Sequence, residues 1–483
     1  MKLIQEGFSC EYEMNVFMKM FFNKDDDAGI YTFFSYENGI IYAKTKIEYK
    51  EKVYEKEYIR PYELRDERTD KIVFRCFVVR SFCDAAQNIK NVSIPWGALS
   101  GIRPAKVVRQ MKEKGMSFDE IRAELKEIFG VRDEKIELAI SVAKKEEEIL
   151  SGLEENAVSI YIGIPFCPSR CLYCSFVSSD LRTGKKYVAD YIRLMAEEMK
   201  KTAQVIKELG FYIENIYIGG GTPTSVDENQ LEFILKSVNE IFDLEKLKEY
   251  TLEAGRADTI TREKLETAKN YGVNRISINP QTMNEETLVR VGRRHTPKMA
   301  EEAFYLAREC GFDNINMDLI AGLPGETAED FKYSLDEVIK LDPENITVHS
   351  LCIKRASDFT KSDYKLSESV EMNNMLDYTQ KRMKETKREP YYMYRQKNIS
   401  GNLENVGYAK KGCHSFYNVN IMEEVQNIIA IGGGGTSKLV RGDRIERIFN
   451  FKDPCEYIRR FDEIIGKKDE FINIYNEMAD DTV

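Results

Sequence analysis

The sequence predicts an α/β protein whose central part alternates strands with helices. Between residues 158 and 351, short apolar runs that are typical of buried strands alternate with longer helical segments. Successive strand–helix units imply a parallel sheet with right-handed crossovers, and ligands of such sheets bind at the carboxyl ends of the strands. A partial (β/α)6 barrel and an open doubly wound sheet both fit this pattern. The predicted strands cover residues 158–164, 213–218, 250–253, 275–279, 314–320 and 345–351.

A separate N-terminal domain is predicted over residues 1–153, β-rich at first and then helical. Two apolar and aromatic runs, 30–36 and 40–46, are split by Glu37-Asn38-Gly39, and Asn-Gly between two such runs is a strong hairpin signal. This part of the chain is therefore expected to form a small sheet. Two further strand-like runs lie near residues 52–58 and 71–79.

Helical periodicity replaces the strand pattern in the second half of this domain. Pro104 stands where the first turn of a helix tolerates proline, and Ser117 and Glu120 have the spacing of a capping box that opens the next helix. Gly130 ends that helix. Residues 134–150 form a third helix, with apolar positions at i, i+3 and i+4.

The remaining chain is predicted to form two more domains. The βα units span residues 154–365, and an α+β appendage covers residues 366–483, where the regular alternation fades. The appendage contains the aromatic run Tyr391-Tyr392-Met393-Tyr394 and four successive glycines, Gly432 to Gly435. The glycines could pack closely against the barrel mouth or turn the chain, and we favour the turn. Three domains accord with a length of 483 residues, which is too long for one compact core.

Composition and charge are those of an ordinary globular protein. Hydrophobic residues make up 42% of the chain and charged residues 31%, and no apolar stretch approaches the roughly 18 residues of a membrane span. The N-terminus turns acidic before an apolar run develops, unlike a secretory signal. We therefore expect a cytoplasmic protein without a membrane partner. The net charge of −10 argues against non-specific nucleic-acid binding, which depends on neutralising phosphates.

Three of the ten cysteines are crowded into the loop that follows the first strand of the βα series. Cys167, Cys171 and Cys174 have the spacing C-x3-C-x2-C, and three thiolates on one short loop suit three irons of a cubane [4Fe–4S] cluster. No fourth cysteine follows nearby, so the fourth iron would be open to a substrate or cosubstrate. The sequence therefore predicts an iron–sulfur cluster at these cysteines.

A structural zinc site and an incidental grouping of three cysteines are the alternatives for the same residues. Structural zinc normally takes four Cys or His ligands from two paired motifs. The chain has three histidines, His295, His349 and His414, none of them adjacent. We therefore favour the cluster.

A glycine-rich turn follows the second strand of the βα series, at the edge where the site of a barrel belongs. The turn is Gly219-Gly220-Gly221-Thr222-Pro223-Thr224. Glycines allow the backbone to approach a ligand closely, and their N–H groups can bind a carboxylate. Most glycine-rich turns are only turns, but the position beside a cluster-bearing loop favours a ligand-binding role.

Four polar residues near the ends of the later strands extend the candidate site. Glu253 ends the third strand with a carboxylate suited to a ribose hydroxyl or an amino group, and Gln281 lies just past the fourth strand, followed by Arg293. Asp318 lies within the apolar fifth strand, where a charge is costly unless it is paired, so we expect a ligand or a salt bridge there. Each residue alone fits a structural role equally well, and their joint arrangement favours a site.

Several motifs together resemble the oxygen-independent coproporphyrinogen III oxidase family of radical S-adenosylmethionine (SAM) enzymes. The resemblance spans residues 158–355, and the N-terminal segment 99–104 is similar to the HemZ-type branch of coproporphyrinogen dehydrogenases. The motifs are Tyr161-x-Gly163-Ile164-Pro165-Phe166-Cys167, the GGGTPT turn, Arg275-x-Ser277-x3-Gln281, Gly292-Arg293-x-His295 and Asp318-Leu319-Ile320-x-Gly322-Leu323-Pro324.

This resemblance implies a partial (β/α)6 radical SAM barrel with one [4Fe–4S] cluster, but it assigns no catalytic side chain. The cluster ligands would be Cys167, Cys171 and Cys174. The positions that contact the SAM bound to the cluster are matched by Tyr161, Gly220 and Glu253. The positions that hold a second SAM in the oxidase are matched by Tyr173, Gly221, Thr222, Gln281, Arg293 and Asp318.

The reaction that the resemblance implies belongs to haem biosynthesis. Two propionates of coproporphyrinogen III would be oxidatively decarboxylated to vinyl groups, giving protoporphyrinogen IX with two SAM molecules consumed. Each propionate would lose a β-hydrogen and CO2, and the remaining electron would pass to an acceptor. By the same analogy, a flavodoxin or a ferredoxin is the expected electron donor.

Two positions depart from the family pattern. Phe176 stands where the oxidase branch has a further cysteine, as it does in the haem-chaperone branch, and Gly163 stands where the family has a histidine. Two other functions therefore stay open: a haem-binding or haem-transfer protein that keeps the cluster, and a radical SAM enzyme that acts on another substrate, such as a tRNA base. The net charge of −10 fits a tRNA substrate poorly.

Overall fold

The structure is a computed structural model that describes residues 1–99, 101, 103–174, 179–352, 368–396, 403–442 and 444–480. The chain divides into two compact units. The first unit comprises Met1–Ala143, Leu366–Asp377 and Met393–Glu404. The second comprises Lys144–Lys365, Tyr378–Tyr392 and Asn405–Val483. The division into three domains that the sequence suggests stays a prediction.

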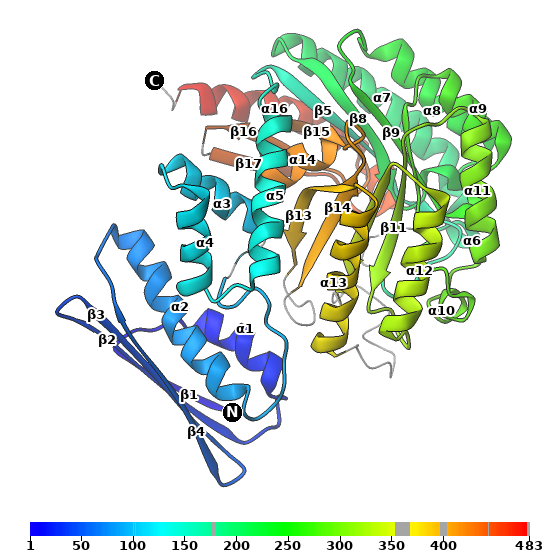
Figure 1. The fold of residues 1–483 in the computed structure, drawn as a ribbon. Helices are drawn as coiled ribbons and strands as arrows, with labels where there is room; N and C mark the ends of the chain where they lie inside the picture. The colour runs from blue at the N-terminus through cyan, green and yellow to red at the C-terminus, as the bar shows by residue number, and fades with distance from the viewer. Residues whose placement is uncertain are drawn as a thin grey trace. The chain divides into compact units, whose positions relative to one another are not determined.

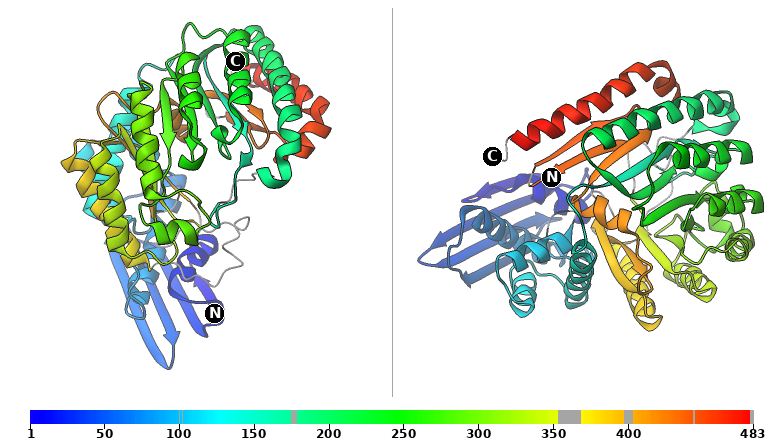
Figure 2. Two further views of the ribbon diagram at one scale, coloured as in Figure 1. Left: turned by 90° about the vertical axis from the view of Figure 1, so that its right-hand side faces the viewer. Right: turned by 90° about the horizontal axis from the view of Figure 1, so that it is seen from above.

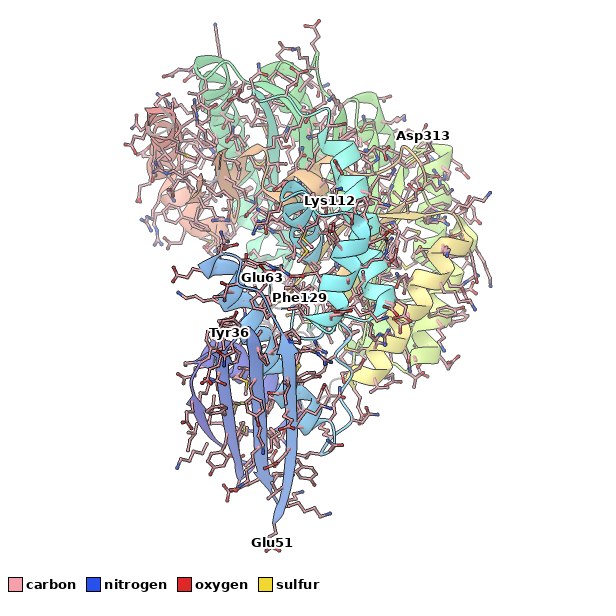
Figure 3. All side chains as sticks on the ribbon, turned by 60° about the vertical axis from the view of Figure 1, so that its left-hand side comes forward. Tyr36, Glu51, Glu63, Lys112, Phe129 and Asp313 are labelled. Carbon is pink, nitrogen blue, oxygen red and sulfur yellow. The ribbon has the colours of Figure 1, made fainter. Side chains whose placement is uncertain are left out.

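The first unit begins with a four-stranded sheet in the order β1-β2-β3-β4. β1 pairs in parallel with β2, and the other neighbours pair as antiparallel hairpins, so the hairpin predicted around Asn38-Gly39 is confirmed. Alternate residues of β2 and β3 are buried, as expected for a sheet with one face packed on helices. Figure 3 shows Glu51 at the tip of the β3–β4 turn, at the opposite end of the sheet from Tyr36. The strands are β1 (Lys2–Glu6), β2 (Ala28–Glu37), β3 (Ile40–Tyr49) and β4 (Lys52–Pro61), and helix α1 (Glu11–Phe21) follows β1.

The strand predicted over residues 71–79 is wrong, because this segment lies inside helix α2 (Glu67–Ala86). The side chain of Asp66 caps the helix by accepting a hydrogen bond from the backbone N–H of Thr69 at 2.9 Å. The apolar run of 71–79 is buried in the core of the unit. A short apolar run is equally typical of a buried strand and of a buried helix, so periodicity alone does not distinguish them.

The helices predicted after this point are confirmed. Helix α3 (Pro104–Glu113) begins at its proline, and α4 (Phe118–Glu127) begins with the capping box of Ser117 and Glu120. Gly130 follows α4 with a φ of +70°, a conformation that glycine adopts without strain. The third helix is α5 (Asp133–Leu150).

The six predicted strands of the second unit are confirmed as neighbouring parallel strands. They lie in the order β12-β11-β10-β9-β8-β5 within an eleven-stranded sheet. The sheet is open rather than closed, as in a partial barrel, and Figure 1 shows the connecting helices on its outer side. The strands are β5 (Ala157–Ile164), β8 (Tyr212–Gly220), β9 (Glu249–Gly255), β10 (Arg275–Ile278), β11 (Ile315–Ala321) and β12 (Asn345–Ser350).

The connecting helices start at residues whose side chains suit a helix N-terminus. Asp227, Thr261, Asn284, Thr296 and Thr327 each accept a hydrogen bond from a backbone N–H of the first turn that follows. Each cap fixes where a crossover begins and therefore how far the preceding loop extends over the strand ends. The helices are α6 (Leu181–Gly184), α7 (Val188–Glu208), α8 (Glu228–Ile241), α9 (Arg262–Asn270), α10 (Glu285–Arg290), α11 (Pro297–Glu309) and α12 (Ala328–Leu341).

The C-terminal segment adds strands to both edges of the parallel sheet. β13 and β14 extend the sheet beyond β12, while β15, β16 and β17 extend it beyond β5. Helix α16 lies alongside α7, as Figure 2 shows. The elements are α13 (Ser369–Glu385), β13 (Glu389–Arg395), β14 (Glu404–Ala409), α14 (Phe416–Glu423), β15 (Asn427–Gly432), β16 (Thr436–Arg441), β17 (Arg444–Phe449), α15 (Pro454–Arg459) and α16 (Phe461–Asp480).

The glycine run in this segment does more than turn the chain from β15 to β16. β15 pairs in parallel with β5, and Gly432 stands opposite Gly163. A Cβ atom on Gly432 would collide with the carbonyl oxygen of Gly163 and would lie 2.6 Å from the hydroxyl of Tyr191. The expectation of a simple turn is therefore incomplete, because the glycines also let β15 pack tightly against the first barrel strand.

Candidate functional site

The three cysteines of the C-x3-C-x2-C motif lie on one loop directly after β5. Cys167 and Cys171 are buried, Cys174 is half-buried, and none of the three forms a disulfide. The backbone N–H of Cys174 donates a hydrogen bond to the carbonyl of Cys171 at 3.0 Å, which makes a tight turn between the last two cysteines. Three thiols on one loop are a donor set that suits an iron–sulfur cluster.

The thiols do not form a closed metal-binding group by themselves. Among the residues that the structure describes, no three His, Cys, Asp or Glu side chains lie close enough together to hold a metal ion. The described part of the loop stops at Cys174 and resumes at Ser179, so the position of Phe176 lies outside it. The donor set of three cysteines on one loop fits the cluster in its chemistry.

The glycine-rich turn after β8 packs directly against the cysteine loop. A Cβ atom on Gly221 would lie 2.9 Å from Sγ of Cys167 and 2.6 Å from the carbonyl oxygen of Phe166, so glycine is needed there. The N–H of Thr222 donates a hydrogen bond to the same carbonyl at 2.8 Å, and its hydroxyl lies 3.4 Å from Sγ of Cys167. Gly220 has a φ of +116°, which other residues rarely adopt. Gly221 and Thr222 therefore lie beside the first cysteine, whereas Gly220 lies against Ile164 of β5.

Glu253 lies beside the same turn, at the end of β9. Its Oε2 occupies the space that a side chain on Gly219 would fill, since a Cβ atom there would lie 2.7 Å away. Removal from water and the nearby charge of Asp318 raise the pKa of Glu253 to about 8, although a hydrogen bond from the Gly220 backbone lowers it. A carboxyl group with such a displaced pKa is typical of a functional site.

Asp318 has protein partners on the inward face of the sheet, as its place in an apolar strand led us to expect. Nδ2 of Asn316 donates a hydrogen bond to it at 2.7 Å, and Nε2 of His349 lies 3.8 Å from its Oδ2. Removal from water alone would raise the pKa of Asp318, but His349 and Asn316 lower it below its ordinary value. Asp318 therefore favours the charged form, in contrast to Glu253.

Arg293 connects the end of β10 with the cysteine loop. Its Nε donates a hydrogen bond to the hydroxyl of Tyr173 at 3.1 Å, and its Nη1 donates one to the carbonyl of Asn279. The loop is also held here by a backbone hydrogen bond of 3.1 Å from Leu172 to Val291. Tyr173 and Arg293, which are far apart in the sequence, thus lie together next to the cysteines.

Gln281 adopts an unusual backbone conformation between β10 and β11. Its φ is +69°, its N–H donates a hydrogen bond to the carbonyl of Asp318 at 2.9 Å, and its carbonyl accepts one from Ile320 at 2.9 Å. Its side-chain oxygen Oε1 is buried and has no hydrogen-bond partner in the described part of the chain. A buried acceptor without a partner is costly, so a ligand that donates a hydrogen bond here would relieve the cost.

The sequence-predicted residues thus lie along one edge of the sheet, where the carboxyl ends of its strands meet the cysteine loop. Their roles as SAM contacts stay predictions. Sequence reasoning missed Tyr217, Tyr417 and the partnership of His349 with Asp318. Strand parity was a usable signal for Tyr217, because it shares the inward face of β8 with Gly219. For Tyr417, which comes from the C-terminal segment, the sequence held no comparable signal.

Comparison with known proteins agrees with the cysteine motif and the fold. The sequence model of the Radical SAM superfamily matches residues 161–338. The chain is 43% identical over 384 residues to the oxygen-independent coproporphyrinogen-III oxidase-like protein HemZ of Bacillus subtilis, a match that covers 78% of this chain and 77% of HemZ. It is also 37% identical over 202 residues to the haem chaperone HemW of the same organism, which covers 42% of this chain and 52% of HemW.

A solved structure shows the same fold. Coproporphyrinogen III oxidase (HemN) from Escherichia coli, a radical SAM enzyme, matches with a TM-score of 0.52 and 23% identity, covering 66% of this chain and 72% of HemN. None of the helices in the described residues is long and apolar enough to span a bilayer. Because the likeness to HemZ extends over more than three quarters of both chains, the chain belongs to the radical SAM superfamily, within the family of oxygen-independent coproporphyrinogen-III oxidase-like proteins, whose cofactors are a [4Fe–4S] cluster and SAM.

Proposed function

We propose that the protein catalyses the oxidative decarboxylation of coproporphyrinogen III to protoporphyrinogen IX. The observation that carries this proposal is a second group of polar residues beside the cysteine loop, in which the side chain of Arg293 binds Tyr173 and the backbone of Gln281 binds that of Asp318. Glu253, at the end of β9, lies over the glycine-rich turn. A reaction that converts two propionates consumes two SAM molecules, and two groups of polar residues suit two such ligands. The similarity to HemZ over most of both chains supports the same substrate class.

The first group of residues would hold the cofactors. Cys167, Cys171 and Cys174 would bind three irons and leave the fourth open to SAM. When bound, the cluster and SAM supply a reductive cleavage of the sulfonium, which yields a radical that abstracts hydrogen. The glycine-rich turn at Gly220 would let the backbone approach SAM closely. The carboxyl group of Glu253 suits a ribose hydroxyl or the amino group.

The second group of residues would hold another SAM. The unpartnered Oε1 of Gln281 would accept a hydrogen bond from the ligand, and the guanidinium of Arg293 would bind its carboxylate. Asp318, whose lowered pKa favours the charged form, would attract the positive charge of the amino or sulfonium group. These are charge pairings that a zwitterionic ligand with a sulfonium satisfies.

The electron balance of the proposed reaction requires two external partners. Each propionate loses a β-hydrogen and then CO2, so that a vinyl group forms and one electron passes to an acceptor. Each SAM cleavage takes up one electron from a donor, for which we propose a flavodoxin or a ferredoxin. The protein's own residues therefore serve to hold and orient the ligands.

An anaerobic assay tests the proposed function. The reconstituted holoenzyme is given SAM, a reductant and coproporphyrinogen III, and porphyrin products and 5′-deoxyadenosine are quantified by mass spectrometry. We expect protoporphyrinogen IX with two 5′-deoxyadenosine per molecule, and neither product from Cys171→Ala. Intact coproporphyrinogen in the presence of steady 5′-deoxyadenosine formation would show that the substrate is a different one.

Haem handling is the second candidate function. The similarity to HemW over 202 residues favours it, because that protein is named a haem chaperone. A haem chaperone binds haem stably, so the protein would show a Soret band after incubation with haem and gel filtration. We expect no haem to be retained, and retention of one haem per chain without coproporphyrinogen turnover would favour the chaperone function.

A further inference from the structure

Three tyrosine rings are stacked on the inward face of the sheet, next to the glycine-rich turn. Tyr161 of β5 and Tyr217 of β8 stand opposite each other in register, with ring centroids 6.3 Å apart and planes at 15°. Tyr417 of α14 stacks on Tyr217 at 4.7 Å and on Tyr161 at 6.4 Å, with interplanar angles of 20°. Tyr417 therefore brings a part of the C-terminal segment, beyond the 161–338 family match, into the barrel.

The side chains of Tyr217 and Glu253 meet over Gly219, where a side chain on residue 219 would have no room. A Cβ atom on Gly219 would lie 2.7 Å from Oε2 of Glu253 and 2.7 Å from Cε1 of Tyr217. The tyrosine ring and the carboxyl group thus both lie over Gly219. The side chain of Tyr217 lowers the pKa of Glu253, as a hydrogen-bond donor to that carboxyl group does.

Tyr417 is itself fixed to the strand that carries Glu253. Glu249, at the start of β9, accepts hydrogen bonds from the hydroxyl of Ser415 at 2.9 Å and from the N–H of Phe416 at 2.7 Å. A buried carboxylate at the N-terminus of a helix is a favourable pairing, so α14 is anchored at its first turn. Tyr417 and Tyr217 are therefore the intermediate residues in a series of contacts that begins at Glu249 and ends at Glu253, at the two ends of β9.

We propose that Tyr217 is a positioning residue that holds the carboxyl group of Glu253 over the glycine-rich turn, and that Tyr417 holds the ring of Tyr217 in place from the C-terminal segment. The inference rests on the proposed role of Glu253 as a SAM contact. It adds that the SAM site depends on a hydroxyl group from β8 and on an aromatic ring from outside the family match.

Filling of the core is the competing explanation for the same three rings. Packing alone needs the aromatic rings and is indifferent to the hydroxyl of Tyr217, because phenylalanine preserves the stack. A positioning role needs the hydroxyl and acts through Glu253. The two explanations are therefore distinguished by removing the hydroxyl of Tyr217 both in a protein that has the carboxyl group of Glu253 and in one that lacks it.

The pH dependence of SAM binding gives a second distinction. The charged and titratable side chains that face Glu253 come from β5, β8, β11, α14 and the segment after α10; they are Tyr161, Tyr217, Asp318, Tyr417 and Arg293. The hydroxyl of Tyr217 favours the charged form of Glu253. Loss of this hydroxyl should therefore raise the pKa of Glu253. The pH profile of binding in Tyr217→Phe should therefore move to higher pH.

The experiment measures SAM affinity by anaerobic equilibrium dialysis on reconstituted holoenzyme, without porphyrinogen. We expect Tyr217→Phe to weaken SAM binding about tenfold, as the loss of one side-chain hydrogen bond does, with iron content and melting temperature unchanged. Tyr250→Phe is the matched control, because this buried tyrosine lies on β9 at a position of opposite parity to Glu253. It should leave SAM affinity unchanged.

The decisive comparison repeats Tyr217→Phe in a Glu253→Gln background. We expect the tenfold effect to disappear there, because the hydroxyl acts through the carboxyl group. An equal effect in both backgrounds would overturn the inference, and so would unchanged SAM affinity in Glu253→Gln alone. Since no porphyrinogen is present, these outcomes are independent of whether the enzyme converts coproporphyrinogen III.

The contribution of Tyr417 is tested by its own pair of variants. Tyr417→Phe keeps the ring and should bind SAM as tightly as the unmodified protein, whereas Tyr417→Leu removes the stack and should weaken binding about threefold and broaden the pH profile. A Tyr417→Leu protein that keeps its iron and its SAM affinity would overturn the part assigned to the C-terminal segment.

Discussion

Two carboxyl groups at the site are driven in opposite directions by their surroundings. Glu253 loses water and faces the charge of Asp318, which raises the pKa of Glu253 to about 8. The pKa of Asp318 is lowered by His349 and Asn316, although this group is also removed from water. One group therefore favours the neutral form and the other the charged form near neutral pH, which is the pattern expected where two carboxyl groups have different tasks.

The raised pKa of Glu253 makes a prediction about stability. Because the pKa is raised from 4.5 to about 8, the folded apoprotein binds this proton more tightly than the unfolded chain, and stability falls as pH rises through that interval. Glu253→Gln should therefore stabilise the apoprotein by roughly 2–4 kcal/mol at pH 8.5 and have little effect at pH 4.5. Urea unfolding at the two pH values measures this, and a pH-independent difference would contradict it.

The cysteine motif makes a prediction about iron content. Three thiolates hold the predicted cluster, so Cys171→Ala should lose most of the iron and the broad absorbance of the reconstituted protein. Cys310→Ala is the control, because this half-buried thiol lies at the end of α11, outside the motif. Iron and sulfide analysis after anaerobic reconstitution tests both variants, and full iron content in Cys171→Ala would count against the assignment.

The candidate residues that the sequence revealed share one property. The cysteines, the glycine turn and Glu253 belong to short motifs or strand ends, so residues adjacent in the sequence are enough to indicate their chemistry. The approach of Arg293 to Tyr173 and the stacking of Tyr417 on Tyr217 depend on contacts between residues far apart in the chain. No local pattern carries such pairs, and they follow only from the folded sheet.

Among the elements, the C-terminal strand β15 explains a departure at Gly163. A Cβ atom on Gly163 would lie 2.9 Å from the carbonyl oxygen of Gly433 and 3.3 Å from the ring of Tyr161. The family's histidine would therefore meet the glycine run of β15, which packs against β5 at this position. Gly163 and the glycine run thus contact each other, and both lack the side chain that would prevent this close packing.

This close contact predicts different effects for two neighbouring glycines. Gly432→Ala should destabilise the protein by about 2–4 kcal/mol, because its Cβ atom would collide with β5 and its φ is +87°. Gly434→Ala has a φ of +77° but nothing within 4 Å of a Cβ atom, so it should cost about 1 kcal/mol. Thermal unfolding of both variants tests the contact, and equal losses would show that backbone strain alone is responsible.

The strands of the barrel could be predicted because each is a short apolar run, and because a helix with a side-chain cap follows each of β8, β9, β10 and β11. The same reasoning failed at α2, where an apolar run without polar alternation suits either element and only the length of the helix decides. The pairing of β15 with β5 could not be predicted from the sequence either, because the whole series of βα units separates the two strands along the chain. Pairing at such distance is set by the complete fold.

At the scale of the molecule, one chain supplies the site from three parts. The cysteine loop and the glycine turn come from the start of the barrel, the polar residues Gln281, Arg293 and Asp318 come from its later strands, and Tyr417 comes from the C-terminal segment. The family match ends at residue 338, so Tyr417 and the strands around it lie outside that match. The proposed SAM site therefore draws on the C-terminal segment as well as on the matched barrel.

Transfer of deuterium from the substrate tests the central claim, decarboxylation of a porphyrinogen by radical SAM chemistry, most directly. Coproporphyrinogen III labelled with deuterium at the β-carbons of its propionates is incubated anaerobically with holoenzyme, SAM and reductant. We expect one deuterium in each 5′-deoxyadenosine and one vinyl group for each 5′-deoxyadenosine formed. Unlabelled 5′-deoxyadenosine together with intact coproporphyrinogen would contradict it.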